Sequence, residues 1–142
     1  MPDQIPTNPK SEASAAKRVL IVEDDPDMRS FYADYLSRVY NVETASDGEE
    51  GLKKLAERPF DLLLLDIMLP KLDGIEFLKK KNTQPSIAPI PTVMLTNLSN
   101  EDIIKQCFKL GAKQYIFKSE TSPDKILLTL NEALSPSDPK SP

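Results

Sequence analysis

The hydrophobic positions of this chain fall into short apolar runs separated by helical patterns. Four consecutive leucines, Leu62–Leu65, form the clearest run. They are too few for a helix of ordinary length, and they suit a strand that is covered on both faces. Residues 41–45 alternate between polar and apolar, which is typical of a more exposed strand. The predicted strands are 19–22, 41–45, 60–66, 92–95 and 115–117.

Between these runs, apolar residues recur three and four positions apart, which predicts amphipathic helices. The first helix carries Met28, Phe31, Tyr32, Tyr35, Leu36 and Val39, and the fourth carries Ile103, Ile104, Cys107 and Phe108. Each helix has a start signal, since capping residues or an early proline precede the apolar face. These signals are Asp25-Pro26, Ser46 with Glu49, Asp73 with Glu76, Ser99 with Asp102, and Ser122-Pro123.

The order is therefore strand then helix, repeated five times. Such alternation predicts an α/β fold with a parallel sheet, helices on both faces and right-handed crossovers. We expect a flavodoxin-like, doubly wound sheet of five strands in the order 2-1-3-4-5, with five helices. The domain should span residues 17–134. Residues 1–16 and 135–142 are rich in proline and polar residues, which predicts a disordered N-terminal arm and C-terminal tail.

Composition excludes several classes of function. The chain has 22 acidic and 18 basic residues, which does not favour nucleic-acid binding. It has no histidine, which excludes a Ser-His-Asp triad or a phosphohistidine within this polypeptide. Cys107 is the only cysteine, and its helical pattern favours a buried structural thiol. No apolar run approaches a membrane span and no secretory signal is visible, so we predict a cytoplasmic protein without membrane contact.

Polar residues stand at the carboxyl ends of four of the predicted strands. Glu23 and Asp24 follow the first strand, Asp66 ends the third, Thr96 follows the fourth and Lys118 follows the fifth. The carboxyl ends of parallel strands meet at one edge of the sheet, where ligands bind in open α/β folds. Each residue alone could be a helix or turn cap, but together they predict one site.

The electrostatics of this set indicate its chemistry. Crowded carboxylates repel one another, and a bound Mg²⁺ would relieve this because it prefers oxygen ligands. Three carboxylates, Mg²⁺ and Lys118 balance in charge, so the site can accept a phosphoryl group. Asp66 is the central carboxylate and therefore the expected nucleophile, with Thr96 and Lys118 binding phosphoryl oxygens.

At these residues the chain resembles the receiver domain of two-component response regulators. The resemblance covers about 18–134. It rests on Val-Leu-Ile-Val-Glu-Asp-Asp, Leu-Leu-Leu-Leu-Asp-Ile-Met-Leu-Pro, Val-Met-Leu-Thr and Gly-Ala…Tyr-Ile-Phe-Lys. It implies that Asp66 is the phosphoacceptor and that Asp24 and the backbone carbonyl of Met68 bind Mg²⁺, with Glu23 acting mostly through water. It also implies that Thr96 and Tyr115 form the switch pair, although Tyr115 taken alone is as consistent with a core residue.

Two positions depart from the family pattern. The family usually has a cis-proline after its lysine, whereas Ser119 follows Lys118 here. A cis bond before a non-proline residue is costly, so either that strain is kept or the loop differs. Asn97 stands after Thr96, where the family commonly has a small residue. Neither departure removes a chemical group of the site.

The expected function is a phosphorylation-controlled signalling switch that catalyses only its own phosphorylation and dephosphorylation. The phosphoryl donor would be a sensor histidine kinase, a histidine phosphotransfer protein or a small phosphodonor. A downstream protein would bind the face made by the fourth helix, fifth strand and fifth helix. The receiver would act either as a stand-alone protein or as part of a larger one. The alternative is a pseudo-receiver that binds partners without being phosphorylated. An aspartate-nucleophile phosphohydrolase is rejected because Met68 stands where a second aspartate is needed.

Overall fold

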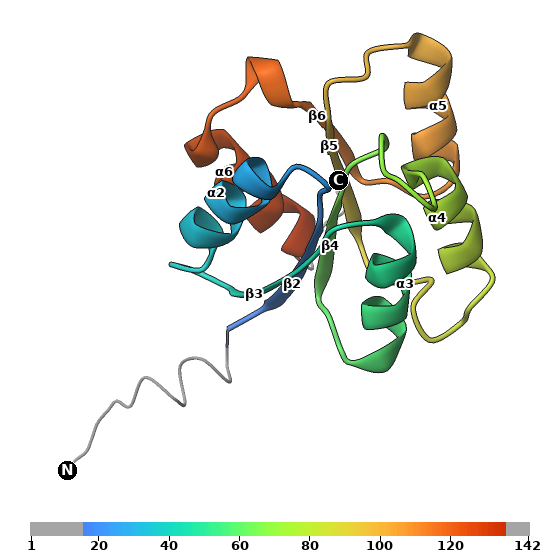
Figure 1. Ribbon diagram of the computed structural model, residues 1–142, viewed down its shortest axis with the longest axis horizontal. Helices are drawn as coiled ribbons and strands as arrows, with labels where there is room; N and C mark the ends of the chain where they lie inside the picture. The colour runs from blue at the N-terminus through green and yellow to red at the C-terminus, as the bar shows by residue number, and fades with distance from the viewer. Residues whose placement is uncertain (1–15, 136–142) are drawn as a thin grey trace.

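The fold is a parallel sheet between two layers of helices, and the computed structural model describes residues 16–135 of it (Figure 1). The predicted arm and tail lie outside this range except at Ala16 and Ser135. The strands within it are β2 (Arg18–Val22), β3 (Asn41–Ala45), β4 (Leu62–Leu65), β5 (Thr92–Thr96) and β6 (Gln114–Phe117). They lie in the order β3-β2-β4-β5-β6, all parallel, which is the predicted order 2-1-3-4-5.

Five α-helices connect or follow these strands within the described residues. Alternate side chains of the central strands face opposite layers, so each layer receives its own apolar cluster. The helices are α2 (Pro26–Leu36), α3 (Gly48–Glu57), α4 (Gly74–Asn82), α5 (Glu101–Lys109) and α6 (Pro123–Leu134), and a 3-10 turn, η1 (Lys118–Glu120), precedes α6. Leu63 and Leu65 pack with α3, α4 and α5, whereas Leu62 and Leu64 pack with α2 and α6.

The N-caps of two helices lie one residue later than predicted. Asp47, rather than Ser46, caps α3 by accepting a hydrogen bond from the Glu50 N–H. Asn100, rather than Ser99, caps α5 by accepting from the Ile103 N–H. Each predicted cap is followed directly by a residue that caps equally well, so sequence spacing alone could not choose between neighbours.

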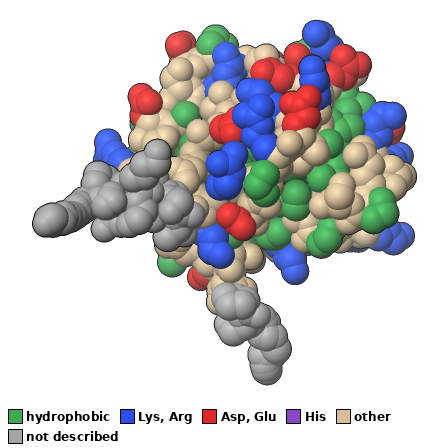
Figure 2. Space-filling view, turned by 90° about the horizontal axis from the view of Figure 1, so that it is seen from below, with side chains coloured by type: hydrophobic (Ala, Val, Ile, Leu, Met, Phe, Trp, Pro, Cys, Tyr) green, Lys and Arg blue, Asp and Glu red, His purple; other side chains and the backbone are tan. Residues whose placement is uncertain are grey.

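The predicted apolar faces contain three exposed positions. Phe31 is 49% exposed, Val39 47% and Phe108 46%. Val39 lies beyond the end of α2, whereas the other two lie within α2 and α5. Elsewhere the surface is of mixed charge, and Figure 2 shows basic side chains interspersed with acidic ones on one face. Among residues 16–135, none of the helices combines the length and the hydrophobicity needed to cross a bilayer.

Lys81 is an unexpected core residue in α4. Its side chain is 3% exposed, and Nζ donates a hydrogen bond to the Ala88 carbonyl at 2.8 Å. The contact ties the loop after α4 back to the helix. Burial lowers the pKa of Lys81 from 10.5 to about 8, because the charged ammonium loses its hydration.

This burial predicts a stability that rises with pH. Between pH 8 and pH 10.5 the unfolded chain binds a proton at Lys81 that the folded protein has released, so raising the pH favours folding. Across this window, we expect the free energy of unfolding of the wild type to rise by about 2–3 kcal/mol relative to that of Lys81→Met. Urea denaturation at several pH values measures it. The exposed neighbour is the control, and Lys80→Met should run parallel to the wild type; equal profiles for Lys81→Met and the wild type would refute the effect.

Candidate phosphoacceptor site

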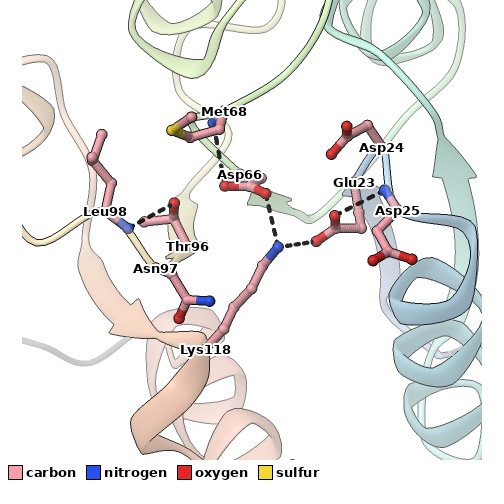
Figure 3. A pocket seen from close by; sticks show the side chains of 9 residues that line it. All are labelled: Glu23, Asp24, Asp25, Asp66, Met68, Thr96, Asn97, Leu98 and Lys118. Carbon is pink, nitrogen blue, oxygen red and sulfur yellow. Dashed lines mark hydrogen bonds and ion pairs between the residues drawn. The ribbon is translucent and has the colours of Figure 1, made fainter.

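The predicted site residues meet at the carboxyl edge of the sheet. Glu23 and Asp24 follow β2, Asp66 follows β4, Thr96 ends β5, and Lys118 follows β6. Because β2 and β5 flank β4, Asp66 lies between the acidic pair and the threonine. These side chains surround a cavity of about 520 Å³ (Figure 3). The lining residues are Glu23, Asp24, Asp25, Asp66, Met68, Thr96, Asn97, Leu98 and Lys118.

Asp66 lies at the base of the cavity and is 5% exposed. Its Oδ1 accepts hydrogen bonds from the backbone N–H groups of Ile67 at 2.7 Å and Met68 at 3.3 Å. Its Oδ2 accepts one from Lys118 Nζ at 2.8 Å. The carboxylate is therefore held in one orientation, with its charge stabilised from two sides (Figure 3).

Lys118 joins the two buried carboxylates of the site. Besides its contact with Asp66, Nζ lies 2.5 Å from Glu23 Oε1. Burial by itself would lower the pKa of Lys118, but the hydrogen bonds and negative charges of Asp66 and Glu23 outweigh it and raise the pKa. Lys118 is thus a fixed cation in the cavity. This direct contact with Glu23 was not predicted.

Glu23 shows the opposite balance. Burial raises its pKa above the ordinary value, although Lys118 and the backbone N–H of Asp25 both act to lower it. That N–H donates to Glu23 Oε2 at 3.1 Å. The desolvated carboxylate lacks sufficient positive charge around it, which is the condition that a divalent cation relieves.

Three carboxylates could hold such a cation. Glu23, Asp24 and Asp66 each offer an oxygen atom, and these atoms lie within 4.8 Å of one another. Glu23 and Asp66 are buried, whereas Asp24 is exposed at the mouth of the cavity. A set made only of hard oxygen donors fits Mg²⁺, which also keeps several waters, and does not fit a soft metal.

The predicted switch residues contact one loop. Thr96 is buried, and its Oγ1 accepts a hydrogen bond from the Leu98 N–H at 3.3 Å. The half-buried Tyr115 donates its hydroxyl to the Leu98 carbonyl at 2.5 Å. Burial raises the pKa of Tyr115 to about 12, and the negative charge of Asp66 acts in the same direction. Both side chains are therefore bonded to the loop that follows β5.

Two contributions to the site were missed by the sequence analysis. Arg29 donates to the backbone carbonyls of Glu23 at 2.9 Å and Asp24 at 3.2 Å, and so holds the acidic turn in place. The sequence signal that could have revealed this contact is an arginine one turn into the helix that follows the acidic pair. The second is a hydrogen bond from the Ser119 N–H to Asn97 Oδ1. The described residues contain no cis peptide bond, so the loop after Lys118 differs from the family pattern.

A comparison with protein families identifies this arrangement. The response regulator receiver domain family matches residues 19–131, which include every residue of the site. The chain belongs to this family. A receiver domain is a module of two-component signalling and not a conventional enzyme.

Individual receiver proteins share both sequence and fold with the chain. A probable chemotaxis protein CheY from Rhizobium etli is 32% identical over 106 residues, covering 73% of this chain and 82% of that protein. The crystal structure of a CheY-like receiver domain protein from Methanospirillum hungatei JF-1 superimposes with a TM-score of 0.77 at 32% identity. That match covers 84% of this chain and 94% of the other.

Other relatives are much longer than this receiver domain. A probable cyclic di-GMP phosphodiesterase from Vibrio cholerae is 37% identical over 105 residues, which are 74% of this chain but only 24% of that protein. For two further relatives the shared part is 15% and 7% of their length. The similarity therefore concerns the receiver domain, and does not extend to the activity of the longer proteins.

Proposed function

We propose that this receiver domain accepts a phosphoryl group on Asp66 and acts as a signalling switch. One observation supports this most strongly: the Asp66 carboxylate is fixed by Lys118 and two backbone N–H groups beside two further carboxylates. A caged carboxylate of this kind combines an oriented nucleophile with the charges that a transferring phosphoryl group requires.

The reaction is a transfer to an Asp66 oxygen. That oxygen attacks phosphorus, a new P–O bond forms, and the bond between phosphorus and the donor breaks. The donor is phosphohistidine in a sensor kinase or phosphotransfer protein, whose imidazole leaves, or acetyl phosphate, whose acetate leaves. Mg²⁺ held by Asp24, Asp66 and the Met68 carbonyl, with Glu23 through water, would supply neutralisation of the phosphoryl oxygens.

Lys118 and Thr96 complete the phosphoryl site in this proposal. Lys118 Nζ already contacts Asp66, so it can hold a phosphoryl oxygen as a point charge. Thr96 would turn its hydroxyl to donate to another phosphoryl oxygen, giving up the hydrogen bond that its Oγ1 accepts from the Leu98 N–H. Tyr115 is bonded to the same loop and would turn inward as the loop moves.

The added charge would shift an equilibrium that exists before phosphorylation. The surface affected is made by α5, β6 and α6, and we propose that a downstream protein binds there. The mixed surface charge gives no support for direct nucleic-acid binding. We also propose that the protein acts in the cytoplasm. The receiver domain would span residues 17–134, between an N-terminal arm and a C-terminal tail.

Intact-mass spectrometry after incubation with Mg²⁺ and acetyl phosphate tests the function. We expect a single phosphoryl adduct that is absent without Mg²⁺ and absent in Asp66→Asn, which keeps the shape of the side chain. If the wild type forms no adduct and does not respond to beryllofluoride, the alternative of a binding module that is not phosphorylated replaces this proposal.

The phosphoryl group should be long-lived. Met68 and Leu98 lie two residues after Asp66 and Thr96 and line the cavity, where an attacking water would approach. Both are apolar and cannot orient that water by a hydrogen bond. Introducing Met68→Asn or Leu98→Glu should therefore accelerate loss of the adduct, which is followed by intact mass after the phosphodonor is removed. A rapid loss in the wild type that neither substitution changes would sink this prediction.

A further inference from the structure

The two positions that depart from the family pattern are bonded to each other. The backbone N–H of Ser119 donates a hydrogen bond of 2.8 Å to the side-chain Oδ1 of Asn97. Asn97 lies in the loop between β5 and α5, and Ser119 lies in η1 after β6. The bond therefore joins two loops that are separate in sequence and that border the same cavity.

The position of this bond relative to the sheet is informative. The ladder between β5 and β6 ends with Thr96 opposite Phe117. Asn97 follows β5 and Lys118 follows β6, and at these residues the backbone leaves the sheet. The asparagine side chain continues the cross-link between the loops after the regular ladder has ended. It lies beside Lys118 at the wall of the cavity (Figure 3).

The two residue types depend on each other. A proline at position 119 would have no N–H to donate, and a glycine or alanine at position 97 would have no side-chain acceptor. Each departure therefore supplies the half of the hydrogen bond that the other needs. The pair provides a non-covalent restraint at the residue after Lys118, where a proline ring would otherwise restrict the backbone.

We propose that Asn97 is a positioning residue that, through Ser119, fixes the backbone from which Lys118 reaches Glu23 and Asp66. The inference rests on the proposed phosphorylation of Asp66 for its functional consequence. Lys118 has a long, flexible stem, and its Nζ lies 2.5 Å from Glu23 Oε1 and 2.8 Å from Asp66 Oδ2. Fixing the backbone at the base of this stem reduces the number of arrangements in which the ammonium misses Asp66.

Asn97→Ala tests the proposal, with Ser119→Ala as the matched control because it keeps the backbone N–H. One such hydrogen bond corresponds to about a fivefold change in an equilibrium or a rate. In Asn97→Ala we expect the Ser119 amide to exchange with solvent about fivefold faster and acetyl phosphate to label Asp66 about fivefold more slowly. The NMR signal of the Lys118 ε-methylene should shift, whereas Ser119→Ala should resemble the wild type in all three measurements.

A rescue variant sharpens the test. Ser119→Pro in the Asn97→Ala background removes the unpaired N–H and restricts the backbone, so it should restore part of the labelling rate. Unchanged amide exchange in Asn97→Ala would overturn the hydrogen bond in solution. Faster exchange without any shift at Lys118 would overturn the positioning role. If the wild type takes no phosphoryl group, the proposed function fails, but the two NMR measurements still decide whether Asn97 positions Lys118.

Discussion

Replacing Lys118 with methionine is expected to slow the phosphorylation of Asp66 about a hundredfold and, at the same time, to strengthen Mg²⁺ binding. The ammonium contacts both Glu23 and Asp66, so it supplies a fixed positive charge beside the proposed phosphoacceptor. Without it, the transferring phosphoryl group loses a charge-assisted contact. The same removal leaves more negative charge around a bound cation, which favours the metal.

The opposite directions of these effects make the prediction specific. Labelling by acetyl phosphate is followed by intact mass, and Mg²⁺ affinity by titration calorimetry. Lys113→Met is the control, because Lys113 is exposed just before β6 and should change neither quantity. If Lys118→Met loses Mg²⁺ affinity together with labelling, the variant has disturbed the whole site, and the separate role assigned to Lys118 is wrong.

The central part of the fold could be predicted because its signals are local and strong. The Leu62–Leu65 run is apolar on both faces, so it had to be an inner strand, and each polar residue that follows a parallel strand comes to the same edge. The order of the strands then brings Asp66 between the acidic pair and Thr96. For these residues, position along the chain determines position in space.

The remainder depended on contacts between distant segments. Lysine is usually a surface residue, and the burial of Lys81 follows from the loop that folds back to place the Ala88 carbonyl against it. The link between Asn97 and Ser119 crosses 22 positions and involves one backbone group, which no residue pattern reports. The metal-ligand roles and the switch roles remain predictions, since they concern states with a ligand or a phosphoryl group.

Gly48→Ala is expected to lower the free energy of unfolding by about 3 kcal/mol. Gly48 begins α3 against the loop between β4 and α4, and an added Cβ would lie 1.8 Å from the Leu72 carbonyl oxygen and 2.7 Å from Leu72 Cβ. No rotation of a side chain relieves a contact with backbone, so the loop itself must move. That loop also carries Met68, whose carbonyl is an expected Mg²⁺ ligand, so Mg²⁺ affinity should fall as well.

Gly111→Ala separates this steric effect from the general cost of replacing glycine. Gly111 has a φ of +106°, and an added Cβ there would meet nothing within 4 Å. Strain in the left-handed region should cost about 1 kcal/mol, but Mg²⁺ affinity should stay unchanged because position 111 lies outside the site. Urea denaturation and Mg²⁺ titration of both variants measure the difference. A Gly48→Ala protein as stable as Gly111→Ala would show that the loop yields easily, and that α3 does not hold the loop that carries Met68 in place.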